Sequence, residues 1–405
     1  MGKKWVKRRH QIIQTIAGVG IIPVIKSKVK IKHDKMRVSR KEPCIILYNH
    51  QTVFDQFLVG MYIKGPVYYV ATEDITSMGF ISKLLKFAVN VIPFKKSTND
   101  INAVRNCISV IKEGGSIAIS PEGNRTYSGE TGNMKPSIVK LVKKLKVPVI
   151  FFKITGGYGA NPRWAEGSRK GLIECRIPKI LKYDDYKDMS NEEFFDYVKK
   201  ELYVNDNDYV GEYKSKRLAE RLERCIYVCP KCGISEFESK GNMFKCKHCG
   251  LETEYLSNKT FKDNYPFKNV LEWYRYQEDY INKLDLSVFG ENEIFSNKAQ
   301  LINVIPYKRK VKLMKECEVK AFSDHIEIVN CENSDLMRVE YSALNAMSVL
   351  GKNKFNFYYE DKIYQVKSDE HFNALKYVNI YYRYVNMNKI KNEEDFDESR
   401  EFLGL

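Results

Sequence analysis

Residues 44–55 read CIILYNHQTVFD, an apolar run followed at once by a polar loop. The run predicts a short buried strand, and His50 and Asp55 both come after its end. If a helix begins near Thr52, the carboxylate turns back onto one ring nitrogen of His50 and leaves the other to take a proton from a substrate hydroxyl. The pattern is typical of a general base with its orienting acid. A helix-capping segment, with Thr52 as the N-cap, is the alternative.

A second polar loop follows another short apolar run, about 70 residues further on. Residues 116–120 read SIAIS and predict a buried strand, and PEGNRTYSG comes directly after it. The planar guanidinium of Arg125 suits a phosphate, and Gly123 lets backbone amides approach an anion closely. An ordinary polar surface turn is the alternative.

Short apolar runs alternate with helix-length segments through this half of the chain. The expected strands are 44–48, 67–71, 91–94, 117–119, 147–154 and 172–177, and the expected helices are 54–63, 79–89, 100–113 and 136–145. Such alternation predicts an α/β fold, a sheet flanked by helices, with both loops at carboxyl ends of strands where such sheets place their sites. Residues 183–224 are polar and predict closing helices at 191–202 and 214–224.

Together the two loops resemble the motifs of the glycerolipid acyltransferase family, the 1-acylglycerol-3-phosphate acyltransferases and their relatives. The matches to its NHxSxxD motif are Asn49, His50, Thr52 and Asp55, and those to its FPEGTRS motif are Pro121, Glu122, Gly123, Arg125 and Thr126. Residues 91–96 (VIPFKK) look like the family's GxxFxxR block, and residues 147–150 (VPVI) look like its final proline-containing strand. All four blocks have the family's order and spacing, and they cover about the first half of the chain.

Three features depart from the family's pattern. Asn124 stands where threonine is usual, and threonine stands at positions 52 and 126 where serine is commoner. Lys95 or Lys96 takes the place of an arginine. A lysine keeps the positive charge but loses the bidentate fork of the guanidinium.

The resemblance implies an O-acyltransferase of phospholipid synthesis. It would move a fatty acyl group from a thioester, acyl-CoA or acyl carrier protein, onto the hydroxyl of a lysophosphatidic-acid-like acceptor. His50 would be the general base, and Asp55 would hold the imidazole in its basic tautomer. The acceptor would be bound by Glu122, Gly123, Asn124, Arg125, Thr126, Lys95 and Lys96. Another lysophospholipid or lipid hydroxyl is the alternative acceptor.

Positive charge is concentrated at the start of the chain. Residues 1–42 hold thirteen Lys and Arg against Asp34 and Glu42, which is +11 of the net +16. Such a cluster beside apolar residues favours an anionic membrane surface, and a solvated basic face is the alternative.

The apolar stretch 11–25 (QIIQTIAGVGIIPVI) is shorter than the ~20 residues that a spanning helix needs. With Trp5, Ile12, Ile13 and Ile16 on one side, it predicts an interfacial amphipathic helix. Lysines follow it in place of a small-residue cleavage site, so we expect no signal peptide. The expectation is a peripheral protein on the cytoplasmic face of a membrane, with no full transmembrane span.

Two cysteine pairs, CPKCG at 229–233 and CKHCG at 246–250, are separated by thirteen residues. Four thiolates at this spacing suit a closed tetrahedral Zn²⁺ site with Cys229, Cys232, Cys246 and Cys249 as ligands, and the segment resembles a zinc ribbon. A disulfide pair or a redox motif is the alternative. Because four protein ligands leave no open position for chemistry, the expected zinc is structural.

A zinc ribbon by itself would also suit a non-enzymatic nucleic-acid-binding module. Against that alternative, the positive charge of the chain lies at the other end, and four lysines in the ribbon face four glutamates: Lys231, Lys240, Lys245 and Lys247 against Glu236, Glu238, Glu252 and Glu254. We therefore do not expect nucleic acid as the partner.

Beyond the ribbon, the pattern changes to short strands at 311–322, 325–329, 336–341, 346–350, 354–360 and 362–366, with a helix at 369–383. This order resembles a pleckstrin-homology-like or GRAM-like barrel, and a generic α+β accessory domain is the alternative. The expected organisation is a basic segment (1–42), an acyltransferase domain (43–224), a zinc ribbon (225–256), a helical linker (257–295), an accessory domain (296–384) and an acidic tail (385–405).

Overall fold

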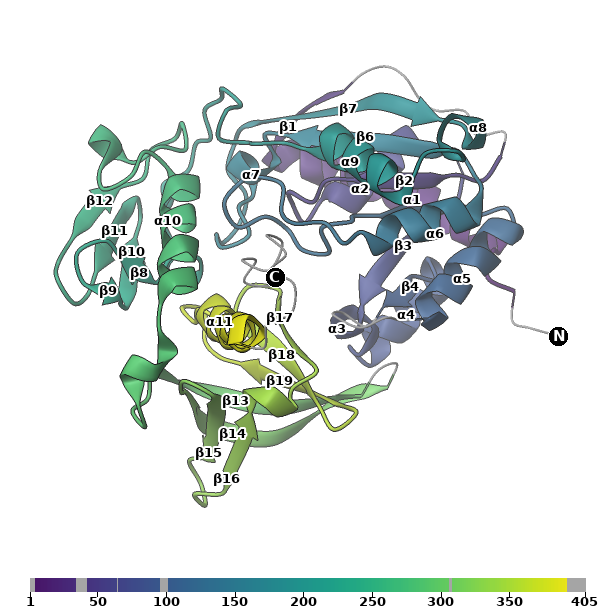
Figure 1. The fold of residues 1–405 in the computed structure, drawn as a ribbon. Helices are drawn as coiled ribbons and strands as arrows, with labels where there is room; N and C mark the ends of the chain where they lie inside the picture. Colours follow the sequence, from purple (N-terminus) through teal and green to yellow (C-terminus); the bar gives the residue numbers. More distant parts are fainter. Residues whose placement is uncertain (1–3, 34–41, 64, 95–100, 306–307, 392–405) are drawn as a thin grey trace. The chain divides into compact units, whose positions relative to one another are not determined.

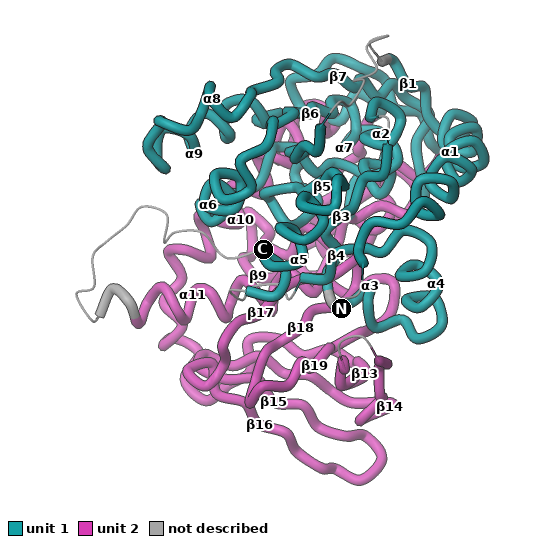
Figure 2. The backbone as a smooth tube through the Cα atoms, turned by 90° about the vertical axis from the view of Figure 1, so that its right-hand side faces the viewer, with its two compact units in different colours: residues 1–163, 167–215, 257–259 teal, residues 164–166, 216–256, 260–405 magenta. Residues whose placement is uncertain are grey.

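The computed structural model describes residues 4–33, 42–63, 65–94, 101–305 and 308–391. The chain divides into two compact units (Figure 2). Unit 1 comprises residues 1–163, 167–215 and 257–259, and unit 2 comprises residues 164–166, 216–256 and 260–405. Most of the expected acidic tail, from 392 on, lies outside the described residues.

Unit 1 is built on a seven-stranded sheet in the order β1-β7-β6-β2-β5-β3-β4 (Figure 1). The strands are β1 (Lys30–His33), β2 (Ile45–Tyr48), β3 (Val67–Thr72), β4 (Ile92–Phe94), β5 (Ser116–Ile119), β6 (Val149–Thr155) and β7 (Leu172–Leu181). Neighbouring strands are parallel except β6 and β7, which are antiparallel. The expected α/β class is therefore present.

The central strand β2 is buried on both faces of the sheet. Ile45 and Leu47 belong to one hydrophobic core, while Ile46 and Tyr48 belong to the other. The first core is covered by α5 (Ile101–Lys112), α6 (Ser137–Leu145) and α9 (Asn191–Leu202), and the second by α1 (Arg8–Lys28) and α2 (Asp55–Tyr62). A strand with apolar neighbours on both sides needs no polar alternation, which is why the continuous run at 44–48 indicates it. Shorter helices are α3 (Glu73–Thr76), α4 (Phe80–Ala88), α7 (Gly157–Ala160) and α8 (Tyr183–Tyr186).

One expectation for the first half is wrong, and one strand was not expected. The expected helix at 214–224 is absent, and the only helical turn there is η1 (Leu222–Arg224). The backbone amides of Leu218, Ala219 and Arg221 donate instead to Asn242 Oδ1, Gly241 O and Ser239 Oγ. The lysine-rich strand β1 was not expected, because its composition resembles the basic segment around it.

The expectation that Trp5 shares a helical face with Ile12 and Ile16 is also wrong. The helix α1 begins at Arg8, so Trp5 precedes it. The backbone N–H of Trp5 donates to Glu113 Oε2 at 2.8 Å, and its side chain packs against the first core. Ile12 and Ile16 of α1 are exposed. Among helices in the part of the chain that the structure describes, none is long and apolar enough to cross a bilayer.

Unit 2 contains both cysteine pairs and a second seven-stranded sheet. The cysteine-bearing segment forms β8 (Val228–Cys229), β9 (Gly233–Ile234), β10 (Phe237–Lys240), β11 (Met243–Cys246) and β12 (Glu252–Glu254), and α10 (Val270–Lys283) and the 3₁₀ turns η2 (Lys262–Asn264) and η3 (Leu286–Phe289) follow. The second sheet is antiparallel, in the order β16-β15-β14-β13-β19-β18-β17, with the helix α11 (Leu375–Lys391) after it.

The strands of the second sheet are β13 (Phe295–Ile305), β14 (Arg309–Ala321), β15 (His325–Asn330), β16 (Leu336–Glu340), β17 (Ala346–Leu350), β18 (Lys354–Tyr359) and β19 (Lys362–Lys367), with the turn η4 (Tyr341–Ala343) between β16 and β17. The sequence indicated all of them except β13. The pairing of β13 with β14 is irregular between Ala299 and Ile302. This irregularity interrupts the alternation of apolar and polar residues by which a strand is recognised in a sequence.

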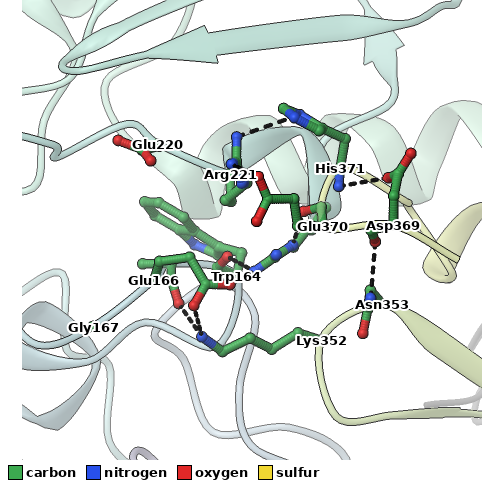
Figure 3. Close-up of polar contacts among 12 residues, drawn as sticks. Trp164, Glu166, Gly167, Glu220, Arg221, Lys352, Asn353, Asp369, Glu370 and His371 are labelled. Carbon is green, nitrogen blue, oxygen red and sulfur yellow. Dashed lines mark hydrogen bonds and ion pairs between the residues drawn. The ribbon is translucent and has the colours of Figure 1, made fainter.

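The short segment 164–166 belongs to unit 2 although residues on both sides of it belong to unit 1. Lys352 Nζ donates to Ala165 O at 2.7 Å and to Glu166 Oε2 at 3.0 Å (Figure 3). The buried Arg224 donates to Trp164 O at 3.0 Å and to Glu166 Oε1 at 2.6 Å. Two cations therefore hold Glu166, and they lower the pKa of its carboxyl against the opposing effect of burial, which raises it.

Candidate active site

His50 and Asp55 meet at the end of β2. His50 follows the strand by two residues, and Asp55 is the first residue of α2. His50 Nδ1 lies 2.7 Å from Asp55 Oδ2, and the carboxylate is completely buried whereas the imidazole side chain is 24% exposed. An ionised carboxylate only accepts hydrogen bonds, so Nδ1 carries the proton and the Nε2 lone pair is left to act as a base.

The Asp55 carboxylate is also fixed by its own loop. The Gln51 amide donates to Oδ2 at 2.7 Å, the Thr52 amide lies 3.0 Å from both oxygens, and the Thr52 hydroxyl donates to Oδ1 at 2.7 Å. Thr52 Oγ1 in turn accepts from the Phe54 amide at 2.8 Å. The alternative with Thr52 as the N-cap is wrong, because Phe54 is the N-cap residue of α2 and no described side chain caps this helix. The loop instead directs a carboxylate onto the imidazole.

Glu122 and Thr126 connect the second loop to the backbone of the first. Glu122 Oε1 accepts from the His50 amide at 2.7 Å, and its Oε2 accepts from the Gly132 amide at 2.8 Å. The Thr126 amide donates to His50 O at 3.1 Å. Burial raises the pKa of Glu122 to about 8, the two amides act in the opposite direction, and the charge of Asp55 adds to the rise. These contacts make Glu122 a shaping residue of the loop.

Arg125 lies in the second loop, partly buried, with a second arginine near it. Arg163 is 2% exposed, its guanidinium lies 4.2 Å from the centre of the Tyr127 ring, and its Nη1 donates to Arg125 O at 3.1 Å. Arg125 Nη1 lies 3.4 Å from Asn161 Oδ1. Burial lowers the pKa of Arg125 to about 10, and the charge of Arg163 lowers it further, whereas the charge of Asp55 raises it. Two cations in one partly buried place favour an anionic ligand.

The other expected binding residues differ in their placement. Gly123 is exposed, with a left-handed φ of +68° and open space where a Cβ would stand. Asn124 is partly buried beside it, and Thr126 is buried, its hydroxyl accepting from the Ser128 and Gly129 amides at 3.2 and 2.9 Å. Lys95 and Lys96 lie outside the described residues; β4 ends at Phe94, the residue before them.

A third loop, after β6, was missed by the sequence analysis. A Cβ on Gly157 would stand 2.6 Å from Gln51 Cβ and 2.9 Å from Thr52 Cγ2, so only glycine allows this approach to the His50 loop. The backbone amides of this loop donate to side chains of other segments. The Tyr158 amide donates to Gln51 Oε1 at 3.1 Å, and the Gly156 and Gly159 amides donate to the buried Asp206 carboxylate. The pair of glycines at the end of an apolar strand was the available signal.

In unit 2, the four expected cysteine ligands come together. Their sulfur atoms all lie within 4.8 Å of one another, with 3.6 Å between Cys229 and Cys249 and 3.6 Å between Cys232 and Cys246. Four sulfurs around a tetrahedral Zn²⁺ with ~2.3 Å bonds would be about 3.8 Å apart, so the cluster fits this ion. Burial alone would raise the pKa of Cys246, but backbone amides and the Ser235 hydroxyl outweigh it and lower that pKa to about 6.

Residues 29–154 match the family model described as Acyltransferase, and this range contains both motif loops. The chain is 25% identical over 167 residues to a chloroplastic 1-acyl-sn-glycerol-3-phosphate acyltransferase of Brassica napus, covering 40% of this chain and 46% of that one.

A probable 1-acyl-sn-glycerol-3-phosphate acyltransferase of Mycoplasma genitalium is 27% identical over 163 residues, covering 39% of this chain and 58% of that one. The chain thus spans about half the length of the curated relatives it matches. Among solved structures, the 1-acyl-sn-glycerophosphate (LPA) acyltransferase PlsC of Thermotoga maritima is similar at a TM-score of 0.40 and 20% identity, covering 47% of this chain and 75% of that one. The family match and the named relatives support an acyltransferase enzyme.

Proposed function

We propose that the protein is a membrane-associated O-acyltransferase of phospholipid synthesis. It transfers a fatty acyl group from a thioester, acyl-CoA or acyl carrier protein, to the free hydroxyl of a lysophosphatidic-acid-like acceptor. The observation that carries the proposal is the 2.7 Å contact between His50 Nδ1 and the buried Asp55 carboxylate. The same loop is hydrogen-bonded to the loop of Arg125, because the Thr126 amide donates to His50 O. The relatives named as 1-acyl-sn-glycerol-3-phosphate acyltransferases support the choice of acceptor.

In this mechanism His50 Nε2 removes the proton from the acceptor hydroxyl. The acceptor oxygen attacks the thioester carbonyl carbon, a C–O bond forms, and the C–S bond breaks. The leaving thiolate takes the proton from the imidazolium, which returns His50 to its starting state. Asp55 stabilises the imidazolium between these steps and keeps the proton on Nδ1 at all other times.

The acceptor phosphate is bound, in our proposal, by Arg125 from the second loop. Its guanidinium is the positively charged group of that loop, and Arg163 lies close enough to lower its pKa. Glu122 and Thr126 hold the loop on the His50 backbone, which fixes the distance between base and headgroup. We propose Lys95 or Lys96 as a further phosphate contact on the basis of the sequence block that they end.

The proposal is tested by mass-spectrometric acyl-transfer assays of the full chain. Lysophosphatidic acid, lysophospholipids with larger headgroups and an uncharged monoacylglycerol are each paired with acyl-CoA and with acyl carrier protein. We expect transfer to lysophosphatidic acid by the wild type and none by His50→Ala, with far-UV circular dichroism as the control for folding. Near-wild-type transfer by His50→Ala would overturn the mechanism, and inactivity of the wild type with every pair would overturn the function.

The remaining parts of the chain are assigned in the same proposal. Cys229, Cys232, Cys246 and Cys249 hold one structural Zn²⁺ in a ribbon at 225–256, which supplies stability to unit 2 and takes no part in catalysis. The accessory domain at 296–384 is pleckstrin-homology-like, as its seven antiparallel strands and following helix suggest. The acyltransferase domain at 43–224 works at the cytoplasmic face of an anionic membrane, where the basic segment 1–42 adds electrostatic attraction.

A further inference from the structure

The segment 75–87, which contains α4, has an unusual number of exposed apolar side chains. Six of them are at least 40% exposed: Ile75, Met78, Phe80, Ile81, Leu84 and Phe87, with Phe80 at 79%. None of the residues of α4 is buried. A surface helix of a globular domain normally packs its apolar side against a core. Here that side faces outward from unit 1, and contiguous exposed apolar surface of this kind marks an interaction site.

The same surface adjoins the exposed side of α1. The two helices are in contact, and Figure 2 shows them along the same side of unit 1. The Arg9 guanidinium lies 4.2 Å from the centre of the Phe87 ring, and its Nε donates to Phe87 O at 3.2 Å. The exposed Ile12 and Ile16 of α1 therefore belong to a helix that is attached to α4.

The charge of this region is mostly positive. No aspartate or glutamate occurs at 1–33 or 75–99, although Glu73 and Asp74 come directly before segment 75–87. Lys83 and Lys86 of α4 and Arg8 of α1 are exposed. Large apolar side chains interspersed with cations and free of acids complement an anionic lipid surface, where apolar groups enter the acyl boundary and cations meet the headgroups.

We propose that segment 75–87 is a second membrane-docking element, which inserts Phe80, Ile81 and Leu84 into an anionic lipid surface beside α1. It extends the membrane contact from the basic N-terminal segment to the catalytic sheet itself, because α4 lies between β3 and β4. The inference shares with the proposed function only the premise that the protein works at a lipid surface. Its test needs no turnover.

The test is sedimentation of the full chain with vesicles of phosphatidylglycerol and phosphatidylcholine in equal amounts. The test variant carries Phe80→Ser, Ile81→Ser and Leu84→Ser. A matched control replaces three exposed apolar residues elsewhere in unit 1, as Ile101→Ser, Ile180→Ser and Val210→Ser. We expect the test variant to partition at least about 30-fold more weakly than the wild type and the control to be unchanged, because each lost side chain removes a large apolar area from the lipid.

A second measurement locates the contact. The variant Phe80→Trp should be quenched by brominated lipid in these vesicles beyond the quenching of the wild-type tryptophans. Wild-type partition by the triple serine variant would overturn the proposal, as would an unquenched Phe80→Trp. Loss of a dimer by the triple variant in analytical ultracentrifugation, with vesicle binding intact, would assign the patch to a second copy of the chain instead and would also overturn it.

The outcome is separable from that of the acyl-transfer assay. If the wild type binds vesicles through segment 75–87 but transfers no acyl group, the docking element stands and the proposed function fails. A further outcome is a triple variant that still acylates a short-chain, monomeric lysophosphatidic acid at the wild-type rate but fails on an acceptor embedded in vesicles. In that case both the docking element and the proposed function stand, because segment 75–87 then acts at the lipid surface and takes no part in the acyl transfer itself.

Discussion

Replacing Asp55 by asparagine keeps the size of a completely buried side chain and removes its charge. In the wild type, Oδ2 lies 2.7 Å from both the Gln51 amide and His50 Nδ1, and 3.0 Å from the Thr52 amide. The asparagine nitrogen accepts none of these three hydrogen bonds, so we expect its oxygen to take the place of Oδ2. Its nitrogen then faces Thr52 Oγ1, which accepts after rotation of the hydroxyl, but it also lies about 3.0 Å from the Thr52 amide nitrogen, from which it cannot accept a hydrogen bond. His50 therefore keeps its proton on Nδ1.

The expected loss is electrostatic. Two unit charges about 4 Å apart attract by about 4 kcal/mol at an effective dielectric constant of 20. Losing most of that attraction to the imidazolium lowers kcat between about a hundredfold and a thousandfold. Asp55→Ala should differ in kind, because it leaves several buried donors without an acceptor at about 1–3 kcal/mol each and so lowers the free energy of unfolding.

The assay compares kcat for lysophosphatidic acid with the urea unfolding midpoint for both variants, and ¹⁵N NMR reports the tautomer of His50. We expect Asp55→Asn to unfold slightly earlier than the wild type with Nδ1 protonated, because one hydrogen bond of the Thr52 amide is lost, and Asp55→Ala to unfold earlier still. A proton on Nε2 in Asp55→Asn would refute the argument that the two amides orient the new side chain. Wild-type kcat in Asp55→Asn would refute the role of the charge.

Arg125→Ala should raise KM for a phosphate-bearing acceptor about 10- to 150-fold, because it removes a contact worth about 1.5–3 kcal/mol, and should leave KM for the thioester unchanged. Arg105→Ala, at an exposed arginine, is the control. Equal effects on both substrates would contradict the assignment. The folded-state pKa of Glu122 is raised to about 8. Its protonated form therefore contributes to the free energy of unfolding at a pH below the usual carboxyl pKa, and this contribution is lost as the pH rises to about 8. The free energy of unfolding of Glu122→Gln should therefore rise relative to that of the wild type between about pH 5 and pH 8, by up to about 1.4 kcal/mol per pH unit. A difference in free energy of unfolding that does not change with pH would count against this. We expect elemental analysis to find one equivalent of Zn²⁺ in the wild type and none in Cys246→Ser, which should loosen unit 2 before it lowers kcat. A metal-free wild type with reduced thiols would end the zinc assignment.

Patterns that are local in the sequence predicted much of this fold. The run at 44–48 is apolar at every position because β2 is buried on both faces, and a loop only a few residues long brings Asp55 back to His50. The four cysteines likewise lie in two short turns, and each turn ends in a glycine with a positive φ, Gly233 or Gly250. In such cases the residues that decide the geometry are close together along the chain.

The rest of the site depends on residues far apart in the sequence. Arg163 reaches Arg125 across 38 positions, and Asp206 holds Gly156 across 50. Nothing in the immediate neighbourhood of either residue marks it as part of the site. The helix expected at 214–224 failed for the same kind of reason, because its amides are satisfied by a turn some twenty residues further on. Helix propensity is a weak signal against such tertiary contacts.

The arginine pair links the stability of the site to its choice of ligand. The charge of Arg163 and the burial of the site both lower the pKa of Arg125, yet at about 10 it remains above neutrality. Arg125 therefore stays protonated at pH 7, and loss of a proton does not relieve the repulsion between the two guanidinium groups. A bound phosphate would relieve it, so the repulsion that destabilises the free site strengthens the binding of an anion. An acceptor with only an uncharged hydroxyl would bring no such negative charge to Arg125, which is why we expect the site to discriminate by headgroup charge before it discriminates by acyl chain.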